Sequence, residues 1–119
     1  MRIPFVKAAL ITAVATLGSL TSAQALELGS VKGVFTNTEG FVKSFGFCGD
    51  GTGAVGEDGF MTNRTYTVKD NLVHVNSNGA FVFELKEDGS ALLPADDFTR
   101  QWAHAEPYVL DEKTTINCN

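Results

Sequence analysis

Histidine is the side chain that most often acts as a general base, and the chain carries two histidines, His74 and His104. A nucleophilic hydroxyl or thiol needs such a base within hydrogen-bonding distance. His74 lies on the polar face of a predicted strand, and the sequence lacks the G-x-S-x-G and H-E-x-x-H patterns. We therefore predict no catalytic residue and no enzyme. A hydrolase that uses His104 with Asp97 or Glu106 ranks last among the functional hypotheses.

Carboxylates gather in a glycine-rich segment from Gly46 to Gly59, which contains Asp50, Glu57 and Asp58. Its six glycines predict a mobile or tightly turning loop. The carboxylates do not have the spacing of an EF-hand, and the segment has no lysine placed to form a phosphate-binding loop. We predict no metal and no cofactor, and we treat these three acidic residues as a candidate binding loop.

The first 25 residues have the three parts of a secretory signal peptide. Two cations precede an apolar run from Ala8 to Leu20, and Ala23-Gln24-Ala25 forms an A-x-A cleavage site. An uncleaved anchor is the alternative, but threonines and serines interrupt the run, and a span needs about 20 mostly apolar residues. We predict that residues 1–25 are removed and that residues 26–119 form one β-domain with no integral membrane span, either secreted or periplasmic.

Cys48 and Cys118 are the two cysteines of the chain. A small exported domain with one pair of cysteines is expected to form a disulfide. A reactive thiol pair would favour a close C-x-x-C spacing, which is absent. We predict a structural disulfide between these residues.

The predicted mature chain is strongly acidic. It has 94 residues, with fourteen acidic and seven basic side chains, and so a formal net charge of −7. Such a surface repels phosphate backbones and anionic membranes, and no cluster of cations offsets it. We exclude nucleic acid as a partner. The length allows one modest core, and we expect a monomer.

The segment from Arg64 to Leu93 alternates between polar and apolar residues. The apolar residues of each run share a face: Tyr66 and Val68, then Val73 and Val75, then Phe81, Phe83 and Leu85. The runs are separated by turn dipeptides, which are Asp70-Asn71, Asn78-Gly79 and Asp88-Gly89, and a short run from Ala91 to Leu93 follows. Asn-Gly and Asp-Gly accept the positive φ angles of tight hairpins. The pattern predicts an antiparallel meander with one buried face.

Two further strands are predicted upstream, from Val31 to Thr36 and from Phe41 to Phe47. Phe41, Phe45 and Phe47 have the same parity in the second of these strands, which predicts that they share a face. Cys48 has the opposite parity. The segment that carries its partner is therefore expected to cross the outside or the rim of the sheet.

The period changes after Pro94, where Phe98, Trp102 and Ala105 fall at helical spacing. Asp96 or Asp97 can cap a helix of two to three turns lying on the sheet, and Pro107 would end it. One or two short strands are expected after it, from Tyr108 to Leu110 and from Thr114 to Cys118. The predicted fold is all-β, mainly an antiparallel meander, forming a small up-and-down β-barrel or sandwich with one short C-terminal helix.

Four aromatic residues are candidates for the lining of a pocket or rim: Phe45, Phe47, Phe60 and Trp102. A small barrel can enclose one apolar ligand, and its rim can dock a partner protein. The alternative is that these side chains form the core.

The order of these pieces resembles small bacterial exported proteins of the lipocalin-like β-barrel kind. The matching pieces are Gly33-Val34-Phe35, Phe45-Gly46-Phe47 leading to Asp50-Gly51-Thr52, Arg64-Thr65-Tyr66-Thr67-Val68, and Phe83-Glu84-Leu85 before Asp88-Gly89. The resemblance covers residues 31–93 and implies the fold alone, since these folds host many functions. The chain departs from it in having Phe35 where tryptophan is common, and in its helical tail.

The sequence favours an exported, non-enzymatic, lipocalin-like binding protein for a small apolar ligand or an exported partner protein. The alternative is an inhibitor or immunity protein of an extracytoplasmic hydrolase, which would insert the acidic glycine-rich loop into a basic cleft.

Overall fold

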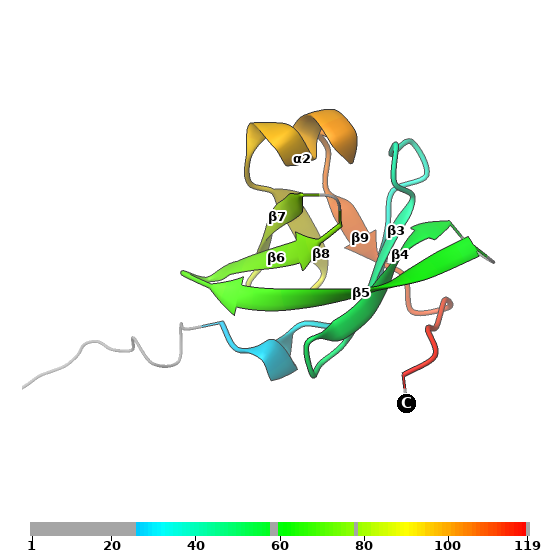
Figure 1. Ribbon diagram of the computed structural model, residues 1–119, viewed down its shortest axis with the longest axis vertical. Coiled ribbons are helices and arrows are strands. Elements are labelled where there is room, and N and C mark those ends of the chain that lie inside the picture. The colour runs from blue at the N-terminus through cyan, green and yellow to red at the C-terminus, as the bar shows by residue number, and fades with distance from the viewer. Residues whose placement is uncertain (1–25, 58–59, 78, 119) are drawn as a thin grey trace, which may run out of the picture.

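Eight antiparallel strands close into a barrel in the computed structural model, which describes residues 26–57, 60–77 and 79–118 (Figure 1). Each strand pairs with the next along the chain, and the last pairs with the first. They are β2 (Lys32–Thr36), β3 (Ser44–Cys48), β4 (Thr52–Glu57), β5 (Phe60–Lys69), β6 (Leu72–Asn76), β7 (Ala80–Leu85), β8 (Ala91–Pro94) and β9 (Tyr108–Leu110). The predicted all-β meander is confirmed, and it closes as a barrel. The predicted signal peptide and its cleavage site lie outside the described residues.

Hairpin turns set the register of the strands. Asp70 and Asn71 join β5 to β6 with φ angles of 54° and 63°, as a two-residue turn of type I′ requires. The turn places Val73 and Val75 opposite Val68 and Tyr66, as the alternation predicted. The other predicted hairpins of this region also form, from β6 to β7 and from β7 to β8.

The interior of the barrel is filled by aromatic rings. Phe45 lies at its centre, with ring centroids 4.8 to 5.4 Å from those of three other residues, which are Phe81, Phe83 and Tyr108. A second group joins Phe47 to Phe35 and Tyr66 at 5.9 and 4.8 Å. All these rings are at most 5% exposed. Edge-to-face contacts of this kind stabilise a core beyond the burial of apolar area alone.

The segment from Gly46 to Gly59 contains a strand, so the prediction of one long loop is wrong. β4 pairs with β3 on one side and with β5 on the other, and Val55 points into the core. Gly53 allows the backbones of β3 and β4 to come close together, because a methyl group at Gly53 would clash with the carbonyl oxygen of Gly46. β5 likewise begins four residues before the predicted start at Arg64.

Both ends of the barrel are covered (Figure 1). The short helix α2 (Asp97–Trp102) lies over one end, and a 3₁₀ turn, η2 (Leu28–Ser30), precedes the buried Val31 at the other. Asp96 caps α2 by accepting a hydrogen bond from the Thr99 N–H at 2.8 Å. Among the described residues no helix is long and apolar enough to cross a membrane.

The helix is shorter than predicted and presents a different face to the sheet. Thr99 and Ala103 are buried, whereas Phe98 and Trp102 are 38% and 44% exposed. The Thr99 hydroxyl accepts a hydrogen bond from the Val82 N–H of β7 at 2.7 Å, which satisfies a buried donor. This polar contact therefore turns Thr99, and not Phe98 or Trp102, toward the sheet. The helical spacing of apolar residues does not predict such a contact.

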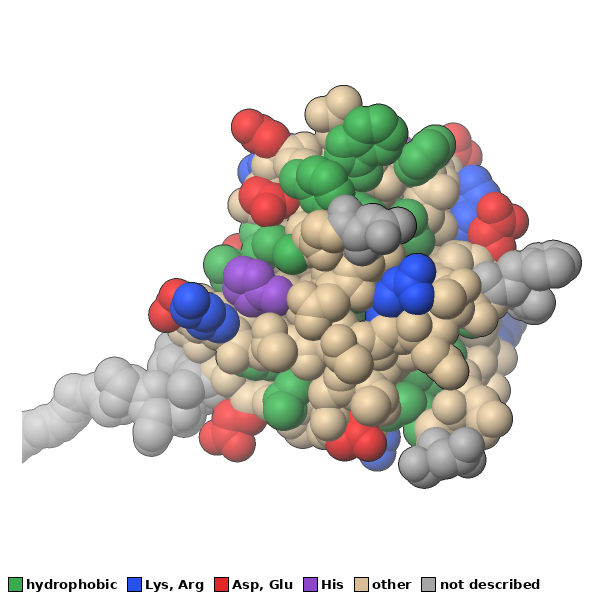
Figure 2. Space-filling view, viewed as in Figure 1, with side chains coloured by type: hydrophobic (Ala, Val, Ile, Leu, Met, Phe, Trp, Pro, Cys, Tyr) green, Lys and Arg blue, Asp and Glu red, His purple; other side chains and the backbone are tan. Residues whose placement is uncertain are grey.

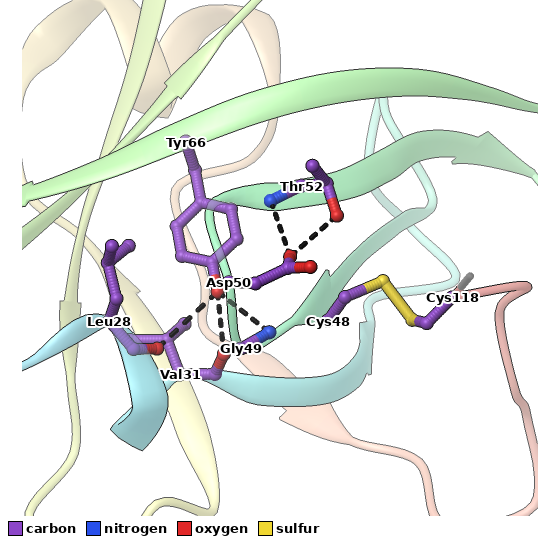
Figure 3. The surroundings of a disulfide bond; sticks show 8 residues. All are labelled: Leu28, Val31, Cys48, Gly49, Asp50, Thr52, Tyr66 and Cys118. Carbon is purple, nitrogen blue, oxygen red and sulfur yellow. Dashed lines mark hydrogen bonds between the residues drawn. A yellow bond between two sulfur atoms is a disulfide. The ribbon is translucent and has the colours of Figure 1, made fainter.

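The C-terminal segment crosses the outside of the barrel, as the parity of Cys48 predicted. Cys48 and Cys118 form the predicted disulfide, with Cα atoms 5.7 Å apart (Figure 3). Residues 111–118, here called the C-terminal strap, contain no strand, so the strand predicted from Thr114 is wrong. Ile116 lies against Gly46 and near Val34, and it covers the outer face of β2 and β3.

Candidate functional site

Two of the three residues of the predicted acidic binding loop, Asp50 and Glu57, lie at opposite ends of β4. Asp50 lies in the turn between β3 and β4, whereas Glu57 ends β4, so the length of the strand, roughly 20 Å, separates them. Asp58 lies outside the described residues. Asp50 is also engaged, because its carboxylate accepts hydrogen bonds from the N–H and hydroxyl of Thr52 at 3.0 and 2.6 Å (Figure 3). The structure therefore assigns Asp50 to a turn and leaves Glu57 at the end near α2.

Two more aspartates repeat this arrangement at the end of the barrel away from α2. Asp88 accepts from the N–H and hydroxyl of Ser90 at 3.0 and 2.6 Å, and Asp111 accepts from the Lys113 N–H and the Thr114 hydroxyl at 3.0 and 2.7 Å. In each turn the hydroxyl contact, followed by the backbone N–H contact, lowers the pKa of the aspartate from its usual range. These carboxylates are ionised parts of the fold.

Acid should therefore weaken the fold through these turns. A carboxylate whose pKa is lower in the folded than in the unfolded chain stabilises the fold above about pH 4, and this stability is lost as the pH falls through the folded pKa. We expect a variant with Asn in place of Asp50, Asp88 and Asp111 to lose less stability than the wild type between pH 5 and pH 3, in urea unfolding at both pH values. Equal losses in the two proteins would contradict this.

The structure describes the surroundings of both histidines. His104 follows α2, and its Nδ1 accepts a hydrogen bond from the Glu106 N–H at 2.9 Å. Asp97 forms an ion pair with Arg100 at 3.2 Å. His74 lies in the middle of β6, in register with Thr67 and Val82. Within the described part of the chain, no group of three or more histidine, cysteine or acidic side chains could hold a metal ion.

Tyr66, which the alternation predicts on the buried face, carries a polar hydroxyl into the interior. Its hydroxyl donates to the Val31 carbonyl oxygen at 3.0 Å and accepts from the Gly49 N–H at 2.9 Å (Figure 3). Burial raises the pKa of this phenol. The hydroxyl joins the N-terminal segment to the β3–β4 turn beside the disulfide, so Tyr66 has a structural role.

Three aromatic side chains are exposed at the α2 end of the barrel: Phe41, Phe98 and Trp102, here called the aromatic rim. They are 74%, 38% and 44% exposed. The rings of Phe41 and Trp102 lie 5.9 Å apart, and Phe98 contacts the buried Phe81 at 5.4 Å. Figure 2 shows hydrophobic side chains gathered over α2 at this end of the molecule. Large aromatic side chains that are exposed together form a candidate binding surface.

A pocket of about 300 Å³ opens beside the aromatic rim. It is lined by Phe41, Val42, Val55, Gly56 and Glu57, and therefore lies between the β2–β3 loop and the end of β4. Its lining combines aromatic and aliphatic residues with one acidic residue. This volume is at the lower limit of sites that bind small molecules.

The β2–β3 loop holds Phe41 in place by contacts with the segment after α2. The Phe41 N–H donates to the Ala103 carbonyl oxygen at 2.7 Å. The Asn37 side-chain amide donates to the carbonyl oxygens of Glu106 and Pro107 at 3.3 and 3.2 Å. Gly40 is also constrained, since a methyl group there would lie 2.6 Å from the Tyr108 hydroxyl. The Phe41 ring is therefore exposed, while hydrogen bonds hold the backbone of its loop in place.

The structure separates the four aromatic candidates of the sequence. Phe45 and Phe47 are 0% and 2% exposed and belong to the core, so they line no rim. Trp102 is 44% exposed and is one of the three residues of the aromatic rim. The side chain of Phe60 lies outside what the structure describes.

Sequence reasoning does not identify Phe41 and Phe98 as candidate site residues. The parity of Phe41 with Phe45 predicts a buried position, but the strand begins at Ser44. The Thr38-Glu39-Gly40 sequence immediately before Phe41 is a turn signal that could have placed it in a loop.

Comparisons of the chain with protein-family models, with curated proteins and with solved structures found no match. The candidate site therefore depends on geometry alone.

Proposed function

We propose that this protein is an exported, non-enzymatic binding protein with a lipocalin-like barrel, and that it binds an exported partner protein through the aromatic rim. The observation that supports this most directly is the exposure of Phe41, Phe98 and Trp102 together at one end of the barrel. Tryptophan and other aromatic side chains supply much of the binding energy of protein interfaces. The adjoining pocket gives this surface a concave part that a partner side chain can enter.

The filled interior favours the outer surface over an internal ligand site. An eight-stranded barrel has room either for its own side chains or for one small ligand. Here the space around Phe45 is occupied by three rings in contact with it. The role of a carrier for a small apolar molecule inside the barrel has correspondingly less support.

The alternative of an inhibitor that inserts one acidic loop also has less support. It requires Asp50, Glu57 and Asp58 on one loop, whereas β4 separates the first two. Asp50 is further occupied by Thr52. An inhibitor that uses the aromatic rim would instead be one form of the proposed partner-binding function.

Capture of partners from an exported-protein fraction tests the proposal. We expect the Phe41→Ala/Trp102→Ala double variant to retain at least tenfold less of the partner than the wild type, as is usual when aromatic residues central to an interface are truncated. Val109→Ala is the matched control, because Val109 is an apolar residue of β9 that is 56% exposed outside the aromatic rim. Capture of the same proteins in the same amounts by the double variant would refute the proposal.

A further inference from the structure

The pocket beside Phe41 is lined by an aromatic residue and an acidic residue. These are Phe41 and Glu57, and Val42 and Val55 are its aliphatic lining residues. Glu57 is exposed, and among the residues that the structure describes the single ion pair joins Arg100 to Asp97. The Glu57 carboxylate is thus available to a cation from outside.

The segments that meet at the α2 end of the barrel, where the pocket lies, are also negative overall. The segments 37–43, 54–57 and 95–107 carry five carboxylates and two cations, which are Glu39, Glu57, Asp96, Asp97 and Glu106 against Lys43 and Arg100. Both cations are engaged, because Lys43 Nζ donates to the Gly40 carbonyl oxygen at 3.0 Å and Arg100 pairs with Asp97. A negative surface of this kind attracts a positively charged partner.

We infer that the pocket receives an arginine side chain of the partner protein, with its guanidinium group against the Phe41 ring and the Glu57 carboxylate. The inference deepens the proposed function and rests on it. Guanidinium groups stack on aromatic rings and bind carboxylates through paired N–H donors, so one arginine can use both groups. Its aliphatic stem matches the Val42 and Val55 walls. An acidic or neutral polar side chain would gain neither contact.

Two blocked peptides test this chemistry directly. Acetyl-Leu-Arg-Leu-amide and its citrulline counterpart have nearly the same shape, but only the first is charged. In NMR titrations of the disulfide-bonded protein, we expect the arginine peptide to shift the amide signals of residues 41, 42 and 55–57. The citrulline peptide should bind about threefold to tenfold more weakly, as expected for the loss of one exposed ion pair and one cation–π contact. Added salt should reduce this difference.

Two variants assign the effect to Glu57. Glu57→Gln should reduce binding of the arginine peptide to the level of the citrulline peptide, while Glu87→Gln, in the β7–β8 turn at the opposite end of the barrel, should leave it unchanged. Equal binding of the two peptides, shifts confined to other residues, or an equal effect of both variants would overturn the inference.

The peptide result and the capture result can fail separately. If partner capture depends on Phe41 and Trp102 but the two peptides bind alike, the arginine inference is wrong and the proposed function stands. If the arginine peptide binds selectively but partner capture ignores the aromatic rim, the assignment of the pocket to a partner protein is wrong.

Discussion

Replacing both Cys48 and Cys118 by serine is expected to lower the free energy of unfolding by about 4 kcal/mol. The disulfide closes a loop with a sequence separation of 70 residues, and in the chain-entropy model a loop of this length contributes about that amount. Small domains are stable by only about 5–15 kcal/mol, so the variant should be close to its unfolding threshold. Urea unfolding of the wild type and the double variant gives the difference.

The C-terminal strap provides the control for this experiment. Removing the disulfide also frees Ile116 from the outer face of β3, and this loss of packing must be separated from the effect of the covalent bond. Ile116→Ala with the disulfide intact measures packing alone. Because Ile116 is only half-buried, this variant should lose much less stability than the serine variant. A loss below about 1 kcal/mol in the serine variant would contradict the entropic role of the bond.

The middle of the chain was predictable because local signals there agree with the tertiary fold. From Arg64 to Leu85 polar and apolar residues largely alternate along the strands, and each turn between β5 and β8 contains Asp, Asn or Gly at the positions that need it. In the turn between β5 and β6, for example, Asp70 and Asn71 adopt the positive φ angles that such a turn needs. Where neighbouring strands are joined by tight hairpins, the sequence also specifies which residues face one another.

β4 was not predictable in the same way. Its sequence, Thr52-Gly53-Ala54-Val55-Gly56-Glu57, has the composition of a loop. The glycines are needed because the β3 backbone comes close to β4, as the contact of Gly53 with Gly46 demonstrates. Such a contact joins two strands and leaves no periodic pattern along β4. The candidate site depends on this strand, since Val55 and Glu57 line its pocket.

The position of the site also depended on where one strand begins. Parity predicts that Phe41 and Phe45 share a buried face only if both lie in the same strand. The structure begins β3 at Ser44, so Phe45 is buried at 0% exposure and Phe41 is 74% exposed. The strand begins three residues later than predicted, and Phe41 is therefore a candidate site residue and not a core residue.

Phe45→Ala is expected to destabilise the fold by about 3–5 kcal/mol, the usual cost of removing a buried phenylalanine ring. The ring contacts Phe81, Phe83 and Tyr108 with centroids at most 5.4 Å away, and it is wholly buried. Because strands of a closed barrel surround these neighbours, they cannot collapse fully into the space that the ring leaves. Urea unfolding followed by tryptophan fluorescence of Trp102 measures the loss.

Phe41→Ala is the matched control, since it removes the same ring four residues earlier in the chain. Its side chain is mostly in solvent, so the free energy of unfolding should change by less than about 0.5 kcal/mol. The same variant should nevertheless weaken partner capture, whereas a loss of stability close to that of Phe45→Ala would mean that Phe41 belongs to the core. The pair of variants therefore distinguishes a ring kept for the fold from a ring kept for binding.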